Sequence, residues 1–200
     1  MPEARLVDTG EGLAPQGDGW FVVNAEDATW MRHDSFGARA NFEVDGRLGA
    51  ERPELQERYF PQLGFTIQVL EPGRPSTMYH RETGQEGFLI VSGECLLIVE
   101  GEERPLRAWD FFHCPPNTTH AFVGAGGGPC VMVSAGARFE DGSILYPRYD
   151  VALKHGAGVE QDTPSPHEAY APFGHSRLGR PDGWNELPWT RPLTLPPPAP

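Results

Sequence analysis

Short runs of apolar residues, separated by turns rich in glycine and proline, dominate the centre of the chain. The segment LGFTIQVLEPG, residues 63–73, predicts a strand that ends in a turn at Pro72–Gly73. Between residues 86 and 137, four or five further apolar runs of about 4 to 7 residues follow, with turn residues between them. Short strands at regular spacing predict an all-β sandwich or barrel, because alternating strands and helices need longer periodic segments.

The two ends of the chain have a different pattern from the centre. Residues 1–19 hold no apolar run, so we expect a loose N-terminal arm there. From residue 139 onward the chain is rich in proline and glycine, yet it keeps aromatic residues that disordered linkers usually lack, namely Tyr146, Tyr149, Tyr170, Phe173, Trp184 and Trp189. We predict an arm at 1–19, a β-barrel at 20–138, and a C-terminal extension at 139–200 that wraps over the barrel or a partner subunit. The final residues LPPPAP are expected to fray.

The charge of the chain excludes one large class of partner. It has 16 basic and 28 acidic residues, a formal net charge of −12, and only one lysine, Lys154. A protein that binds nucleic acid needs clustered lysine or arginine to neutralise phosphates, so we do not expect nucleic-acid binding. The 24 glycines and 21 prolines favour many short strands joined by turns over long helices.

The chain shows no targeting or membrane segment. The first 20 residues lack the apolar core of a signal peptide, and no stretch of 18 apolar residues occurs. The three cysteines, Cys95, Cys114 and Cys130, are odd in number and lie in apolar runs, which is typical of buried, reduced thiols. We therefore expect a cytoplasmic protein that does not bind a membrane.

The first group of residues with chemical potential follows the turn at Pro72–Gly73, in the stretch MYHRETGQEGFLI. Residues two apart in a strand face the same way, so His80 and Glu82 share a face if this segment is extended. Glu86 shares a face with Phe88 at the start of an apolar, inward-facing stripe. A glutamate in that place is expected at the mouth of a cavity.

The second group lies in the stretch WDFFHCPPNTTHAFVG. Pro115 and Asn117 predict a tight turn, because asparagine tolerates the left-handed conformation that such turns need. His120 follows on the same face as Phe122, where it is expected to point into a barrel. His113 precedes the turn; it either lines the pocket or is a hydrogen-bonded structural residue.

Two histidines and a carboxylate, His80, His120 and Glu86, form the donor set that suits Fe(II) with open coordination positions. Glu82 offers a fourth, oxygen ligand. Zn, Mn and Ni fit the same donors, and neutral imidazole and ionised carboxylate need no unusual pKa near neutrality. The opposing interpretation is that these polar residues bind no metal and are held by hydrogen bonds alone.

Both stretches resemble the conserved motifs of the cupin family. The first cupin motif places a glycine, then two histidines, a glutamate and a second glycine at set intervals, and Gly73, His80, Glu86 and Gly93 occupy corresponding positions here. Glu86 and Gly93 have the expected six residues between them. The resemblance covers roughly residues 60–137.

The second cupin motif is less complete in this chain. Pro115 and His120 keep its spacing, whereas Trp109, Asn117 and Gly124 replace its first glycine, second glycine and asparagine.

The first motif departs from the family pattern at one metal ligand. If His80 is the first histidine of the motif, Glu82 replaces the second; if His80 is the second, Met78 replaces the first. Both alignments keep His80, Glu86 and His120. We interpret Glu82 as a weak or water-bridged ligand.

The resemblance implies a cupin-type double-stranded β-helix, that is, a jelly-roll barrel, with the N-terminal arm and long C-terminal extension added. It also implies one divalent transition metal per chain (Fe, Mn, Ni or Zn), no organic cofactor, and a homodimer paired through edge strands. The implied activity is a metal-dependent reaction on a small polar molecule, such as dioxygenation, isomerisation or decarboxylation, with Glu82 or His113 as the base.

Two other functions remain open for such a barrel. A non-catalytic cupin uses the metal only to anchor a small-molecule ligand, and a metal-free barrel is purely structural.

Overall fold

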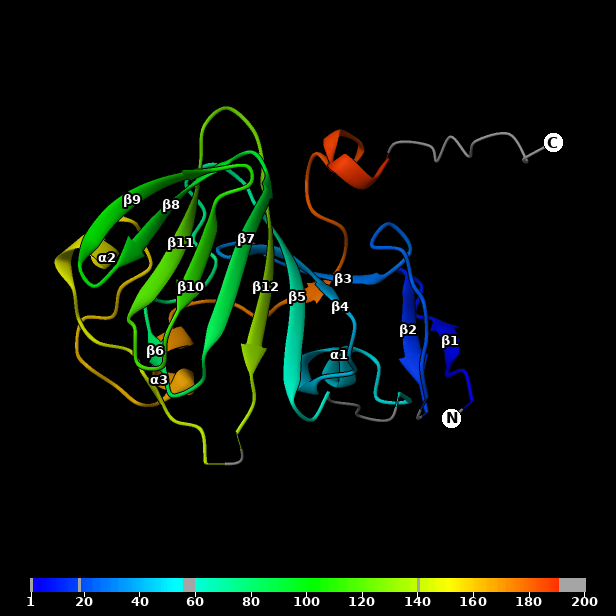
Figure 1. Ribbon diagram of the computed structural model, residues 1–200. Coiled ribbons are helices and arrows are strands. Elements are labelled where there is room, and N and C mark those ends of the chain that lie inside the picture. The colour runs from blue at the N-terminus through cyan, green and yellow to red at the C-terminus, as the bar shows by residue number, and fades with distance from the viewer. Residues whose placement is uncertain (1, 18, 56–59, 140, 191–200) are drawn as a thin grey trace.

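Two antiparallel sheets form the body of the protein in the computed structural model, which describes residues 2–17, 19–55, 60–139 and 141–190 (Figure 1). The larger sheet has the strand order β10-β7-β12-β5-β4-β3-β14, and the smaller has the order β11-β8-β9. The larger sheet comprises β3 (Thr29–His33), β4 (Gly37–Asn41), β5 (Leu63–Leu70), β7 (Glu86–Ser92), β10 (Phe111–Cys114), β12 (Cys130–Ala137) and β14 (Arg177–Leu178). The smaller sheet comprises β8 (Glu94–Val99), β9 (Glu102–Arg107) and β11 (His120–Ala125).

The main core lies between these sheets and follows from the alternation along each strand. Phe88 and Ile90 of β7 point to one side, as the sequence predicts, and meet Leu97 of β8 and Phe122 of β11 from the other sheet. Burial of each such side chain stabilises the fold by roughly 1.5–3 kcal/mol. This arrangement of antiparallel sheets around one core confirms the predicted all-β jelly roll.

A second apolar layer covers the opposite face of the larger sheet. Trp30, Val69 and Val131 form its centre, and Trp184 and Trp189 of the C-terminal extension pack against it. The ring centroids of Trp30 and Trp189 lie 5.3 Å apart in a stacked arrangement, and Trp184 meets Trp30 edge-on at 5.4 Å. The two tryptophans belong to the short 3₁₀ helices η1 (Trp184–Glu186) and η2 (Pro188–Thr190).

The N-terminal residues form an ordered hairpin instead of the loose arm that the sequence predicts. Strands β1 (Arg5–Asp8) and β2 (Leu13–Gln16) pair antiparallel. The hairpin is held because Ala14 is fully buried in a cluster with Met31 and with Leu48 of helix α1 (Gly46–Glu51). Short apolar contributions of this kind give no periodic signal in the sequence.

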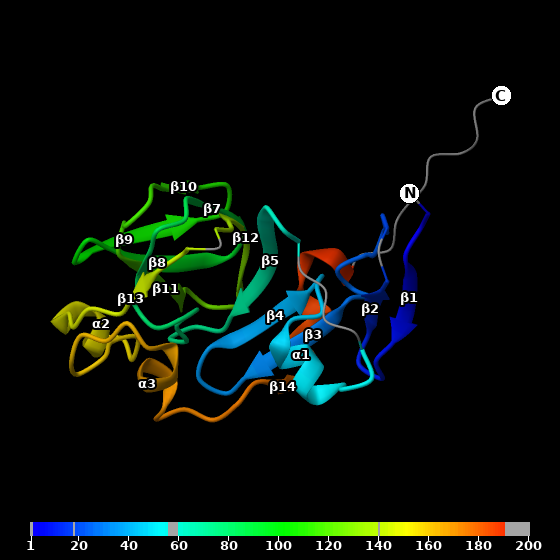
Figure 2. The ribbon, with the colours of Figure 1, turned by 90° about the horizontal axis from the view of Figure 1, so that it is seen from below.

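The first part of the C-terminal extension lies at the opposite end of the molecule from the hairpin, around β6 (Arg81–Glu82) and its partner β13 (Ile144–Leu145) (Figure 2). Helices α2 (Asp150–Lys154) and α3 (Pro166–Tyr170) follow. Their neighbourhood includes a cluster of Met78, Tyr146, Val159 and Ala169, to which Tyr170 and Phe173 add. Aromatic residues of the extension therefore contact the barrel, while the exact boundaries of the three parts stay a prediction.

Within the described ranges, the helices are too short and too polar to cross a membrane. The predicted fraying of the last six residues, LPPPAP, lies outside the described residues.

Candidate metal centre

Three of the predicted ligands come together at one end of the barrel core. His80 precedes β6, Glu86 begins β7, and His120 begins β11. One potential ligand atom from each of these residues lies within 4.8 Å of the others. The described part of the chain thus places two imidazoles and one carboxylate in the arrangement that the sequence predicts.

Backbone hydrogen bonds fix the two histidines opposite each other. The His80 N–H donates to the His120 carbonyl at 3.1 Å, and the His120 N–H donates to the His80 carbonyl at 2.8 Å. The turn before His120 is also anchored, because the Asn117 N–H donates to the Glu82 carbonyl at 2.6 Å. Asn117 has a φ of 66°, so the predicted left-handed turn residue is confirmed.

Hydrogen bonds also orient both imidazole rings. Nδ1 of His80 lies 2.7 Å from the Met78 carbonyl, and Nδ1 of His120 lies 3.1 Å from the Thr118 carbonyl. A carbonyl accepts only, so Nδ1 of each ring carries the proton and Nε2 is directed to the cluster. Metal-binding histidines in proteins are commonly oriented by a hydrogen bond of this kind.

The two carboxylates approach the Nε2 atoms from the more open side. Glu82 Oε1 lies 3.4 Å from His80 Nε2, and Glu86 Oε2 lies 3.4 Å from His120 Nε2. The histidine side chains are 9% and 3% exposed, whereas Glu86 is 18% and Glu82 is 39% exposed. Access to the cluster from solvent is therefore from the side of the glutamates.

Burial gives His120 and Glu86 unusual acid–base properties. The pKa of the His120 imidazole falls to about 4, because burial disfavours its charged form and the neighbouring His80 adds to this effect. The pKa of Glu86 rises to about 7, because burial and then the negative charge of Glu82 disfavour ionisation. Both groups are thus driven toward their neutral forms.

His80 and Glu82 behave as a pair. Burial lowers the pKa of His80, but the Glu82 carboxylate and the Met78 carbonyl outweigh it, so the net shift of that pKa is upward. The hydrogen bond from His80 lowers the pKa of Glu82 against the effect of burial. A divalent cation between these groups would take the place of the proton that His80 and Glu82 share.

Aromatic side chains form the buried wall of the cluster. The rings of Phe88 and His120 lie 5.1 Å apart, and Phe112 and Phe122 each lie about 6 Å from the His120 ring. Cys114 Sγ lies 3.5 Å from His120 Nδ1. Burial raises the pKa of this thiol to about 12, so Cys114 stays protonated at neutral pH.

The comparison with protein families agrees with this geometry. Residues 66–136 match the family model described as cupin domain, which includes His80, Glu86 and His120. This part of the chain is a cupin domain. The jelly roll described above is therefore the fold of a cupin.

Curated relatives of this cupin include enzymes from Xanthomonas species. The 3-hydroxyanthranilate 3,4-dioxygenase of Xanthomonas euvesicatoria pv. vesicatoria is 32% identical over 74 residues, which cover 35% of this chain and 42% of that enzyme. The enzyme of the same name from Xanthomonas oryzae pv. oryzae is 28% identical over 86 residues, which cover 41% of this chain and 49% of that enzyme. The chain thus matches less than half the length of these relatives.

Solved structures with a similar course of the chain include a sugar phosphate isomerase of the cupin superfamily from Silicibacter pomeroyi. It is 19% identical to this cupin, covers 73% of this chain and 77% of its own, and has a TM-score of 0.43. A likeness at this level carries no functional assignment.

The structure does not bring His113 to the candidate metal centre of the cupin. On β10, Phe112 packs on the core and Cys114 is buried, so His113 between them points to the opposite face and is exposed. The alternative that His113 lines the pocket rested on its position just before the turn. It did not take into account which face of β10 the side chain occupies. We assign no catalytic role to His113.

Sequence reasoning missed an aromatic neighbour of the cupin's cluster. The ring of Tyr146 lies 5.7 Å from the ring of His80, and Tyr170 packs edge-on against Tyr146 at 5.9 Å. The Tyr170 hydroxyl accepts a hydrogen bond from the Met78 N–H at 3.1 Å. The persistence of aromatic residues in the proline-rich extension was the available signal, but it does not say which residues they contact.

Proposed function

We propose that this cupin binds one divalent transition metal ion per chain through His80, Glu86 and His120, with Glu82 as a weaker or water-bridged fourth ligand. The observation that carries the proposal is the shared orientation of the two imidazoles. Each uses Nδ1 for a backbone carbonyl and directs Nε2 to a carboxylate 3.4 Å away. Such an arrangement supplies converging donor atoms in a mostly buried place.

The charges around the cluster also support a bound cation. Glu86 is buried next to the ionised Glu82, and this raises its pKa. A divalent ion would compensate both carboxylates and would favour the neutral imidazole that His120 already adopts. The donor set of nitrogen and oxygen atoms fits Fe, Mn, Ni or Zn, and two histidines with one carboxylate are typical of non-haem Fe(II).

We infer further that the cupin is a metal-dependent enzyme that acts on a small polar molecule. When bound, the ion supplies Lewis acidity and, if it is iron, the ability to activate dioxygen. Glu82 is ionised and partly exposed beside the cluster, so it is the residue placed to accept a proton from a substrate. The likeness to enzymes named dioxygenases puts dioxygenation ahead of isomerisation and decarboxylation.

The second proposed function is non-catalytic binding of a metal-anchored small molecule. The low exposure of the cluster favours it, because three of the four donor side chains are less than one-fifth exposed. A closed site holds an ion without admitting a substrate. The homodimer and the cytoplasmic location stay predictions under either function.

Metal analysis by mass spectrometry of the purified, tag-free protein tests the metal site. The protein would be loaded separately with Fe²⁺, Mn²⁺, Ni²⁺ and Zn²⁺ and then dialysed. We expect about one ion per chain in the native protein. We expect that ion to be lost in Glu86→Gln and His120→Gln, because each substitution removes one of the three main proposed ligands. Glu102→Gln, whose side chain is 65% exposed on β9, is the matched control and should keep the metal.

Circular dichroism of each variant shows whether it is folded, so loss of metal is not confused with loss of structure. Equal metal content in all four proteins, or no bound metal in the folded native protein, would contradict the metal site.

Water-proton relaxation of the Mn²⁺-loaded protein separates the two functions. An exchangeable water on the ion raises the relaxation rate of the solvent and supports the enzyme, because a substrate needs a coordination position that can open. A saturated protein that leaves the solvent rate unchanged supports non-catalytic binding.

A further inference from the structure

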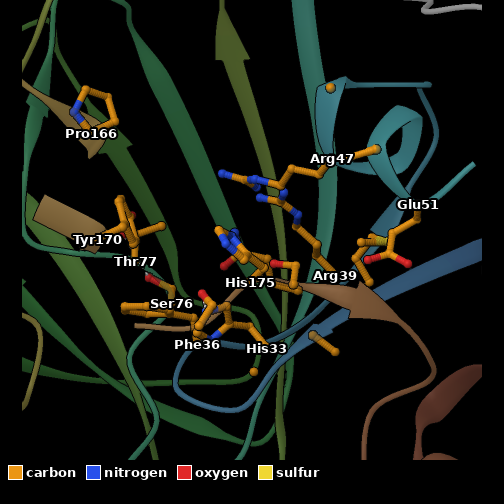
Figure 3. A pocket seen from close by; sticks show the side chains of 18 of the residues that line it. His33, Phe36, Arg39, Arg47, Glu51, Ser76, Thr77, Pro166, Tyr170 and His175 are labelled. Carbon is orange, nitrogen blue, oxygen red and sulfur yellow. Dashed lines mark hydrogen bonds between the residues drawn. The ribbon is translucent and has the colours of Figure 1, made fainter. Parts of the chain in front are cut away.

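A cavity of about 650 Å³ lies apart from the metal centre, between the β3–β4 hairpin, α1, β5 and α3 (Figure 3). Its volume is in the range of sites that bind small molecules. The described residues that line it do not include His80, Glu86 or His120. This cavity is therefore a separate feature of the protein.

An unpaired arginine reaches into the cavity. Arg47, near the start of α1, points into it from the α1 side in Figure 3. Its guanidinium makes no hydrogen bond or ion pair with any other residue that the structure describes. The Arg47 side chain is exposed to solvent, so its guanidinium is accessible to an anionic ligand.

The floor of the cavity holds two further polar groups with unmet hydrogen bonds. Arg39 of β4 and Gln68 of β5 are paired in register, so both side chains project from the same face of the sheet. Within the described ranges, neither the buried Arg39 Nη2 nor the buried Gln68 Oε1 has a hydrogen-bond partner. Arg39 Nη2 lies 3.8 Å from Asp45 Oδ2, too far for a hydrogen bond. A buried polar group without a partner destabilises the folded protein, so these groups favour a bound ligand.

The cavity lining carries two arginines although the chain has a formal net charge of −12. Its charged residues are Arg39, Arg47 and Glu51, and Arg39 also forms an ion pair with Asp45 at 3.8 Å. Asp45 is partly used elsewhere, because its other carboxylate oxygen, Oδ1, accepts hydrogen bonds from the backbone N–H groups of Arg47 and Leu48.

The histidines of the cavity have different roles. His33 is held by the structure, since Nδ1 accepts from the Ser35 N–H at 3.0 Å and Nε2 lies 2.7 Å from the Gly174 carbonyl. Both ring nitrogens of His33 are therefore already engaged with the protein backbone. His175 is exposed and points toward the cavity in Figure 3, where it adds a second kind of hydrogen-bond donor.

Apolar side chains line the remainder of the cavity. Met31 is buried beneath it, and Phe36 and Pro166 form part of its rim. A ligand that fills this space needs an apolar body as well as a charged end.

We propose that this cavity binds a small organic anion with an apolar body. Its carboxylate or phosphate group accepts hydrogen bonds from the guanidinium groups of Arg47 and Arg39. A hydroxyl group on the same molecule donates to Gln68 Oε1. Arginine suits both anionic groups because its planar guanidinium donates two parallel hydrogen bonds.

Two tyrosine side chains, Tyr170 and Tyr146, lie between the cavity and the proposed metal ligand His80. Tyr170 lines the cavity and packs on Tyr146, whose ring lies 5.7 Å from the ring of His80. Arg47 and Arg39 contact none of the proposed metal ligands. The proposal therefore does not depend on a bound metal, and its test is designed to succeed or fail separately from that of the metal site.

Isothermal titration calorimetry of the full-length protein with four probes tests the proposal. Benzoate and phenyl phosphate carry the two anionic groups on the same ring, 2-hydroxybenzoate adds the hydroxyl, and benzyl alcohol lacks the charge. We expect benzoate or phenyl phosphate to bind, and the tighter of the two identifies the preferred anion. We expect 2-hydroxybenzoate to bind more tightly than benzoate, and benzyl alcohol to bind most weakly.

Variants place the bound probe in the cavity. Arg47→Met should weaken binding of the anionic probe roughly tenfold or more, because charge-assisted hydrogen bonds are lost. Arg47→Lys should fall between this variant and the native protein, since lysine keeps the charge but not the paired donors. Arg104→Met, at a side chain 61% exposed on β9, is the matched control and should not change binding.

The same titration in Glu86→Gln separates the cavity from the metal site, because binding should be unchanged there even when the metal is lost. Three results would overturn the proposal. These are no heat from either anion at millimolar concentration, equal affinity for benzyl alcohol, and equal weakening by Arg47→Met and Arg104→Met.

Discussion

At the scale of single residues, the neighbouring His120 and Glu86 respond to pH in opposite ways in the metal-free protein. The folded state lowers the pKa of His120 from 6.5 to about 4, so the stability that depends on its neutral form is complete above pH 6.5 and is lost as the pH falls toward 4. The folded state raises the pKa of Glu86 from 4.5 to about 7, so its contribution is complete below pH 4.5 and is lost as the pH rises through 7. Between pH 7 and pH 5 the two effects oppose each other.

Substituting either Glu86 or His120 should expose the pH dependence of stability that comes from the other residue. In metal-free protein taken from pH 7 to pH 5, we expect Glu86→Gln to lose about 2 kcal/mol of unfolding free energy relative to the native chain, because the gain from Glu86 is missing. We expect His120→Gln to gain a similar amount, about 2 kcal/mol, relative to the native chain. Urea unfolding at both pH values, in the presence of a chelator, measures these differences. Parallel pH profiles for all three proteins would show that the two groups titrate normally.

The three proposed metal ligands were predictable from the sequence because each lies in a short motif whose spacing sets its position on a strand. His80, Glu86 and His120 needed only strand alternation and two turns. The face of His113 and the contact of Tyr146 with His80 were not predictable in this way. The face that His113 occupies depends on where β10 begins. Tyr146 and His80 are 66 positions apart and meet only through the packing of the extension.

At the scale of the elements, the β7–β8 hairpin holds Glu86 and the core stripe in register, and its turn depends on Gly93. This residue has a φ of +75°, and a Cβ atom there would lie 2.4 Å from the Pro129 carbonyl oxygen. Gly73 also has a positive φ, of +80°, but a Cβ atom there would meet nothing within 4 Å. Alanine at position 73 would therefore introduce backbone strain alone, whereas alanine at position 93 would introduce both strain and a steric clash.

We expect Gly93→Ala to reduce the unfolding free energy by about 2 kcal/mol or more, because strain and a clash with backbone atoms add together. Gly73→Ala should cost about 1 kcal/mol, from the left-handed conformation alone. Gly127→Ala, which meets open space without a positive φ, is the control and should be close to neutral. Thermal unfolding ranks the three variants, and equal losses at 93 and 73 would mean that Pro129 moves away at little cost.

The other elements show where sequence reasoning ends. Helix α1, Gly46–Glu51, has no clear apolar periodicity, and its start is set by Asp45, which accepts hydrogen bonds from the Arg47 and Leu48 N–H groups. The β1–β2 hairpin has too few apolar residues to be recognised, and its stability comes from contacts with β3 and α1. Both elements arise from capping and long-range packing rather than from periodicity.

At the scale of the whole molecule, the last described part of the C-terminal extension covers the outer face of the larger sheet, while the candidate metal centre lies on the inner side. Leu187 is 2% exposed and belongs to the cluster around Trp30, Val69 and Val131. The part of the extension around Leu187 is thus expected to stabilise the sheet without contacting the proposed metal ligands.

Leu187→Ala should lower the unfolding free energy by about 2 kcal/mol or more, because it leaves a cavity against the sheet. Val22→Ala, at a side chain 76% exposed, should change it by less than about 0.5 kcal/mol. Chemical unfolding measures both, and metal content should be the same in both folded proteins. A large loss of metal in Leu187→Ala would contradict the separation of the two faces.

The reciprocal backbone bridge between His80 and His120 has a consequence for the order of events during folding. The two residues lie 40 positions apart, and each donates its N–H to the other's carbonyl. Closing so long a loop requires that the intervening strands have already come together. An ion that needs both imidazoles can therefore bind only an assembled barrel, so it acts on the rate at which the finished protein comes apart and not on the rate at which it forms.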